Sequence, residues 1–263
     1  YNFKKAYKLN KNLSNTLINI GNILSLKDKN YYSVLAYKKA LKNFDKKGDI
    51  LANISIAYAR IKDFENTKKY YDEALKFGTK NASLKLSLSY LYIYKEKFNN
   101  AWDLFDARIH NSKFFKEKHN PKLISYILSN DQNFKKTDNI LVLREQGIGE
   151  EILFSSLYQD IINYSEKVTI EADPRLIKIF ERSFKNKIFV KDGSFSNNIK
   201  NLKKFDKVIF AGSLCKKFRK NLNDFKKYKY LISDEKTDIK ISKRFFLDNK
   251  KLKIGISWKS VVS

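Results

Sequence analysis

A spacing of 34 residues recurs through the first half of the chain and constrains its fold more than any other feature. Large aromatic residues follow this spacing, and so do small residues in separate registers: Phe3, Tyr37, Tyr71 and Phe105; Ala6, Ala40 and Ala74; and Gly21, Ser55 and Ser89. Two antiparallel helices in each unit explain the pattern, because small residues allow helices to approach closely and large ones fill the holes of the next unit. A single unit cannot bury its own apolar face, so the units must stack into a solenoid.

This repeat resembles the tetratricopeptide repeat. We place its units at Ser14–Lys47, Gly48–Asn81 and Ala82–Phe115, and Tyr1–Leu13 matches the end of a fourth, so we expect the chain to begin inside a repeat. Arg108 is the exception in the alanine register. The turn proline that is usual in this family is missing from all three units. We expect the recurring aromatic residues to be core, and such solenoids often hold a peptide or a partner domain on the concave face.

Beyond Phe115 the period is lost, and strands are expected to alternate with helices. Residues 116–138 are predicted to form a connecting helix and a linker. Short apolar runs predict strands at Ile140–Arg144, Lys167–Glu171, Lys187–Val190, Lys207–Phe210 and Lys251–Trp258. Helices are predicted over Glu150–Tyr164, Pro174–Phe184 and Asp238–Asp248. This alternation implies right-handed crossovers and a parallel sheet. The predicted fold class is therefore an α-solenoid followed by a Rossmann-like parallel α/β domain.

Composition excludes several kinds of site. The single cysteine, Cys215, excludes a disulfide framework, and two histidines, His110 and His119, exclude a His-rich metal centre. No uncharged apolar run is long enough to span a bilayer. The net charge of +26 suggests nucleic acid, but only 7 of the 54 basic residues are arginine, and residues 1–130 carry +14 against +12 for the remainder. We interpret this even spread as a general lysine bias, since a nucleic-acid arm would be concentrated and rich in arginine.

The loop after the first predicted strand carries the clearest candidate site. It reads Glu145-Gln146-Gly147-Ile148-Gly149-Glu150 and leads into a predicted helix. Glycines let a ligand approach the backbone, and ligands of parallel sheets bind at this end of the strands. The third glycine of a dinucleotide fingerprint is missing and Glu150 would repel a pyrophosphate, which disfavours NAD and FAD. Glu150 has two interpretations: it stabilises the helix N-terminus, or it is a general base at the mouth of a cleft.

Residues Arg144–Ile152 resemble the Glu-Gln-Gly-Leu-Gly-Asp loop of bacterial tetratricopeptide-repeat glycosyltransferases. That family is similar to the heptosyltransferases and, more distantly, to protein O-linked sugar transferases. Further stretches agree in order over about Asn139–Ser260: Asp173-Pro174-Arg175-Leu176 and Phe180–Phe184; Gly212-Ser213-Leu214 and Phe218-Arg219; Tyr230-Leu231; and Gly255-Ile256-Ser257-Trp258, which resembles the strand that opens the family's second domain.

The resemblance implies a GT-B enzyme, in which two Rossmann-like domains enclose the active site. Residues 1–115 would be the repeats, 116–138 the connection, 139–250 the acceptor domain and 251–263 the start of the donor domain. The family's loop aspartate falls on Glu150, the implied general base, and Glu151 is an adjacent alternative. Acceptor or loop contacts would come from Glu145, Gln146, Gly147, Gly149, Arg175 and Ser213, and the donor domain would open at Gly255, Ser257 and Trp258. The alternative interpretation of Arg175, and the one we favour for Arg182, is an ion pair on the helix surface with Glu171, Asp173 or Glu181.

The implied substrates are a nucleotide-sugar donor and a hydroxyl of a protein or glycan, with no metal or other cofactor. The implied location is the cytoplasm, or the periphery of the inner membrane. A donor domain would need on the order of 100–150 further residues, so we expect the gene to continue and these residues alone to be inactive. One alternative is a non-catalytic repeat scaffold that binds another protein. The other is a nucleic-acid binder, for which the lysine-rich composition predicts only weak, salt-sensitive binding.

Overall fold

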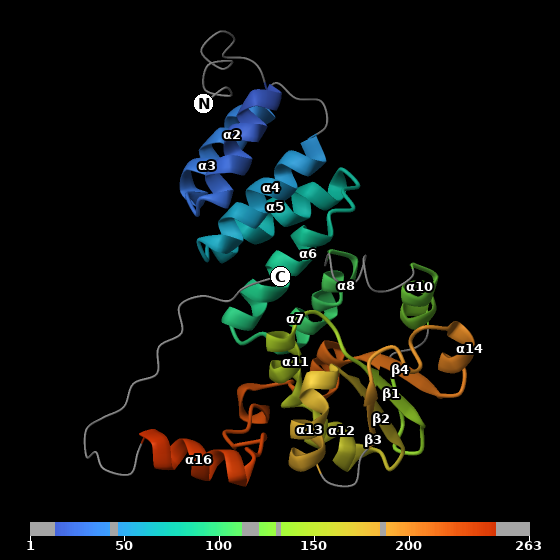
Figure 1. Cartoon of the computed structure of the whole chain (residues 1–263). Helices are drawn as coiled ribbons and strands as arrows, with labels where there is room; N and C mark the ends of the chain where they lie inside the picture. Colours follow the sequence, from blue (N-terminus) through green and yellow to red (C-terminus); the bar gives the residue numbers. More distant parts are fainter. Residues whose placement is uncertain (1–13, 43–46, 112–120, 130–132, 185–187, 246–263) are drawn as a thin grey trace.

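The computed structural model describes residues 14–42, 47–111, 121–129, 133–184 and 188–245 (Figure 1). Paired helices stack at one end of this part of the chain, and a small sheet flanked by helices lies at the other. Four predicted features lie outside the described residues: the half-repeat at Tyr1–Leu13, His119, the strand at Lys251–Trp258 and, within it, the expected donor-domain residues Gly255, Ser257 and Trp258.

Three helical hairpins form the first half of the described chain, which confirms the predicted helical repeat. They consist of α2 (Ser14–Leu26) with α3 (Asn30–Leu41), α4 (Lys47–Arg60) with α5 (Phe64–Lys76), and α6 (Ala82–Tyr94) with α7 (Phe98–Phe105). Each turn contains a residue in the left-handed region, and these residues again lie 34 apart: Asp28, Lys62 and Glu96, with φ of 55°, 63° and 56°. The following backbone N–H bonds back to the helix in every case, which ends all three helices in the same way.

The small-residue registers lie where helices meet. Ser55 Oγ donates to the Thr67 carbonyl and Ser89 Oγ donates to the Ala101 carbonyl, both at 2.8 Å, so each hydroxyl joins the two helices of its hairpin. Ala40 and Ala74 are fully buried. A Cβ at Gly21 would overlap the ring of Tyr37. Larger residues at these positions would force the helices apart, which is the physical cause of the repeat pattern.

The second half contains a four-stranded parallel sheet in the order β3-β2-β1-β4. Its strands are β1 (Ile140–Leu143), β2 (Val168–Ala172), β3 (Ile188–Lys191) and β4 (Lys207–Phe210), within one residue of the predicted limits. The connecting elements are α11 (Ile148–Ser155), α12 (Tyr158–Tyr164), α13 (Pro174–Ser183) and α14 (Ile199–Leu202). All four residues of β1 are buried, as the centre of a parallel sheet requires.

One predicted helix is wrong: Glu150–Tyr164 forms two helices, α11 and α12, instead of one. The guanidinium of Arg219 explains the break, because it donates to the Ser156 carbonyl at 3.0 Å and to Asp160 Oδ2 at 2.7 Å. Helix α16 (Glu235–Phe245) begins three residues before the predicted start at Asp238. No helix of the described residues is both long and apolar enough to cross a bilayer.

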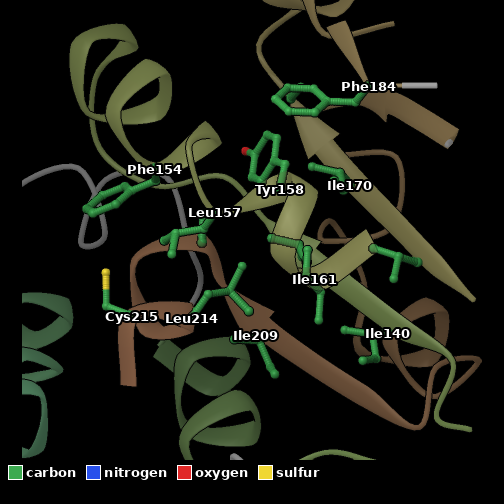
Figure 2. Close-up of a cluster of buried hydrophobic side chains, with 14 of the residues drawn as sticks. Ile140, Phe154, Leu157, Tyr158, Ile161, Ile170, Phe184, Ile209, Leu214 and Cys215 are labelled. Carbon is green, nitrogen blue, oxygen red and sulfur yellow. The ribbon is translucent and has the colours of Figure 1, made fainter. Parts of the chain in front are cut away.

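The solenoid and the sheet share a core. Phe98, Trp102 and Phe105 of α7 belong to the same buried cluster as residues of β1, α11 and α12. Figure 2 shows the part of this cluster around Tyr158, with Phe154 and Leu157 on one side and Ile170 and Phe184 on the other. The opposite face of the sheet packs on Ile109 of α8 (Ala107–Asn111) and on α10 (Pro121–Ser129). The last repeat is therefore packed directly against the α/β unit.

Candidate functional site

Glu150 lies at the carboxyl edge of the sheet, in the first turn of α11. The chain turns sharply after β1 through Gln146, whose φ is 60°, and Gly147 is the N-cap residue of α11. Glu150 is exposed and forms no hydrogen bond or ion pair with any described residue. Its Oε2 folds back over Gly147, where an added Cβ would lie 3.0 Å from it, so a larger residue there would push the Glu150 side chain slightly aside. An exposed carboxylate at a helix N-terminus can accept a proton from a bound hydroxyl, and its role as a base stays a prediction.

Glu145, predicted as a loop-binding residue, is fully buried and points away from the loop surface. Its Oε2 accepts from Arg108 Nε at 2.6 Å, while Oε1 accepts from Arg108 Nη2 at 2.8 Å and from the Gly212 amide. Arg108 also donates to Asp106 at 2.7 Å and to Ser213 Oγ at 3.0 Å. Ser213 Oγ in turn donates to Asp106 at 2.7 Å. Both predicted contact residues, Glu145 and Ser213, thus join the solenoid to the α/β unit.

We call the contacts of Arg108 with Glu145, Asp106 and Ser213 the joint between the solenoid and the α/β unit. Its arginine, Arg108, is held fully charged. Burial alone would lower the pKa of Arg108, but the charge and hydrogen bonds of Glu145, followed by those of Asp106, outweigh burial and raise it. The Phe105 ring lies 4.3 Å from the guanidinium carbon of Arg108 and covers it. A Cβ at Gly212 would lie 2.7 Å from Glu145 Oε1 and 2.9 Å from Arg108 Nη2, so only glycine fits beside the pair.

Glu151, the alternative base, is enclosed within a second ionic cluster at the ends of the strands. Its Oε1 accepts from the Asp173 amide at 2.8 Å, and its Oε2 lies 2.7 Å from Arg144 Nε. Arg144 Nη1 lies 3.2 Å from both Asp173 and Asp192. Burial raises the pKa of Glu151, although the Asp173 amide and Arg144 oppose this. These groups hold the carboxyl ends of β1, β2 and β3 together. Of the two candidate bases, Glu151 is therefore buried and Glu150 faces solvent.

The remaining predicted residues are placed as follows. Arg175 is 72% exposed and pairs with Asp173 at 2.9 Å, as its surface interpretation expects. Arg182 donates from Nε to the Ile232 carbonyl at 2.7 Å, so the expected bond to an acidic side chain is replaced by one to the backbone. Cys215 is buried, and burial raises its pKa to about 12. His110 is exposed on α8. Gly149 faces open space.

A groove between α4 and α6 was not located by sequence reasoning beyond the general expectation of a concave face. Its volume is about 390 Å³, and it is lined by Ile56, Ala59, Arg60, Lys62, Ser83, Leu86, Ser87, Tyr90, Leu91 and Tyr94. Tyr90 and Tyr94 are 53% and 56% exposed. They lie 34 residues after Ile56 and Arg60, so the repeat register itself contained the signal. The groove is formed by equivalent positions of two successive units.

Among the described residues, no three His, Cys, Asp or Glu side chains are placed to hold a metal ion. No protein-family profile matches the chain. No curated protein matches it either.

Solved structures similar to the chain include two tetratricopeptide-repeat proteins. One is YrrB, described as having an unusual peptide-binding site, at 22% identity and a TM-score of 0.36, over 41% of this chain and 56% of that protein. The other is PilF of Pseudomonas aeruginosa, at 16% identity and a TM-score of 0.36, over 48% of this chain and 55% of that one. The chain spans just over half the length of each. The class that its own described residues define is a helical-repeat solenoid packed onto a small parallel α/β unit.

Proposed function

We propose that the chain is a repeat scaffold that binds an extended peptide segment in the groove between α4 and α6. The observation that carries this proposal is the lining of the groove, which combines apolar side chains with two half-exposed tyrosines. Tyrosine offers a rigid ring and a hydroxyl at low entropic cost, so it suits the contact of a peptide backbone and its side chains. The ring of Tyr90 also packs on Phe105 at 6.3 Å between centroids, which fixes its position before a ligand binds.

The groove is formed jointly by two repeat units. Its two sides come from helices of successive units, as in the concave binding surfaces of stacked repeats. Leu86 and Ile56 supply apolar surface between the helices, while the tyrosines stand on the C-terminal half of α6. A segment lying across both helices would bury apolar side chains between them and keep its backbone near the tyrosine hydroxyls.

Fluorescence anisotropy with defined peptides tests this function. The probes are fluorescein-labelled peptides of about nine residues, each with leucines and a tyrosine in a glycine–serine background, in neutral, acidic and basic versions. We expect Tyr94→Ala to weaken binding about tenfold, the loss typical of a tyrosine anchor. Tyr32→Ala on α3 is the matched control, because Tyr32 is 60% exposed but lies outside the groove. The proposal fails if no peptide binds, or if both variants weaken binding equally.

A second candidate function is glycosyl transfer, and the exposure of Glu150 favours it. We propose that its carboxylate removes the proton of an acceptor hydroxyl while the oxygen attacks the anomeric carbon of a sugar and a nucleoside diphosphate leaves. The strand order β3-β2-β1-β4 matches the first four strands in the 3-2-1-4-5-6 order of doubly wound nucleotide-binding sheets, which supports the proposal. The unpaired, exposed state of Glu150 also suits a group that must meet a substrate.

Mass spectrometry tests glycosyl transfer through the release of nucleoside diphosphate from a panel of nucleotide sugars. The assay uses the longest polypeptide that the gene encodes. Glu150→Gln should abolish release, and Glu166→Gln, an exposed carboxylate in the turn before β2, should leave it unchanged. Full activity of Glu150→Gln would exclude the base role, and an inactive parent protein would leave the scaffold as the only function of the two.

A further inference from the structure

We propose that the groove selects acidic peptide segments, whose side-chain carboxylates are bound by Arg60 and Lys62. This inference rests on the peptide-binding function proposed above and names the chemistry of the partner.

The first observation is that both cations line the groove without an acidic partner. No Asp or Glu lines the groove. Among the described residues, neither Arg60 nor Lys62 forms an ion pair, whereas Lys68 pairs with Asp72 on the same solenoid and Lys216 pairs with Asp103 where the solenoid meets the α/β unit. The groove therefore presents two exposed charges that a bound carboxylate can neutralise through charge-assisted hydrogen bonds, beside apolar surface.

The second observation is that neutral groups hold both cations in position. Arg60 Nη1 donates to Ser25 Oγ at 2.6 Å and to the Ser25 carbonyl at 3.2 Å. Lys62 Nζ lies 4.3 Å from the centroid of the Tyr94 ring, a cation–π distance. These contacts orient the side chains but leave their charge uncompensated. A ligand thus meets cations that are already ordered, which reduces the entropic cost of binding.

The third observation is that the two cations lie together at one end of the groove. Lys62 Nζ lies over the ring of Tyr94, and Arg60 lines the same groove two residues before Lys62. Acidic residues of a ligand are therefore favoured at the end of the groove where Tyr94 lies.

The experiment compares acidic peptides with their amide versions, in which Gln and Asn replace Glu and Asp, using the same anisotropy assay. We expect the chain to bind the acidic peptide at least tenfold more tightly. Arg60→Gln/Lys62→Gln should abolish this preference and leave the affinity for the amide peptide unchanged. The matched control is Lys69→Gln/Lys76→Gln on α5, which removes the same charge from exposed positions outside the groove. The control should keep the preference.

The outcomes separate this inference from the function on which it rests. If no peptide binds, or if Tyr94→Ala and Tyr32→Ala weaken binding equally, peptide binding in the groove fails. If Tyr94-dependent binding is found but acidic and amide peptides bind equally, acidic selection alone is overturned. If the preference falls equally in both double variants, it comes from the overall charge of +26 and the assignment to Arg60 and Lys62 is overturned.

Discussion

Replacing Arg108 by methionine should severely destabilise the chain, because this residue holds the last repeat against the sheet. Its side chain is only 2% exposed and donates to Glu145, Asp106, Ser213 and the Phe105 carbonyl. Methionine keeps much of the apolar volume but no donor. Glu145 would still accept a hydrogen bond from the Gly212 amide, but it would lose the positive charge that compensates its own negative charge.

The magnitude follows from the burial of the pair. Removing one member of a buried ion pair costs about 3–5 kcal/mol, because the remaining charge is left uncompensated. Domains are stable by only about 5–15 kcal/mol, so the loss is a large fraction of the total. The double variant Arg108→Met/Glu145→Gln should recover about 1–3 kcal/mol of it, since the amide oxygen can still accept from Gly212 without a buried charge.

Unfolding in guanidinium chloride, followed by tryptophan fluorescence, measures both values. Trp102 is buried at the same interface, and its Nε1 donates to the Arg219 carbonyl. A Trp258→Phe background makes Trp102 the sole reporter, since the chain has two tryptophans. A loss below about 1 kcal/mol for Arg108→Met, or a double variant as unstable as the single one, would refute the reasoning.

Two substitutions and one labelling experiment test the α/β unit. The hydroxyl of Tyr158 is buried without a hydrogen-bond partner among the described residues, so Tyr158→Phe should leave the free energy of unfolding equal or raise it by about 1 kcal/mol; a clear loss would contradict this. The pKa of Asp173 is lowered, chiefly by its hydrogen bond from Arg175. The ionised Asp173 carboxylate therefore stabilises the folded state at pH values above its unfolded pKa of about 4, and this contribution is lost as the pH falls toward the lower folded pKa. The stability deficit of Asp173→Asn should thus be largest near neutral pH and shrink toward about pH 2, as urea titrations at several pH values would show. Cys215, whose pKa burial raises to about 12, should react with iodoacetamide at pH 8 only after denaturation, and rapid native labelling detected by mass spectrometry would disprove its burial.

The solenoid could be predicted from the sequence because its determinants are local and repeated. Ser55 and Ser89 each join the two helices of their own hairpin, and such contacts leave a periodic trace. The strands were equally readable, because a buried parallel strand such as β1 is a short apolar run.

The break between α11 and α12 could not be predicted, since Arg219 causes it from 63 residues away. The same holds for the contact of Glu145 with Arg108, which lies 37 residues before it. Pattern analysis placed Glu145 in a loop, and a loop residue is expected to face solvent. Yet the sequence did carry one signal. Arg108 interrupts the alanine register, and the structure explains this exception. Ala40 and Ala74 are fully buried within the solenoid, whereas Arg108 pairs with Glu145, which follows strand β1.

A variant at the joint, Arg108→Met, can also distinguish the two proposed functions experimentally. Ring contacts run from Tyr90 in the groove to Phe105 and on to Phe154 of α11, at 6.3 and 6.4 Å between centroids, so the groove and the helix that carries Glu150 are one packed unit. Acidic selection depends on Arg60, Lys62 and Tyr94, which lie at the other end of the groove from this joint. Under conditions where Arg108→Met is still folded, peptide affinity should therefore persist. Any Glu150-dependent release of nucleoside diphosphate should fall on the order of a hundredfold, because a shift of about 1 Å at a catalytic group costs that much. Equal losses of both activities in the folded variant would contradict this separation, and unchanged release would show that the contact of Arg108 with Glu145 does not position Glu150.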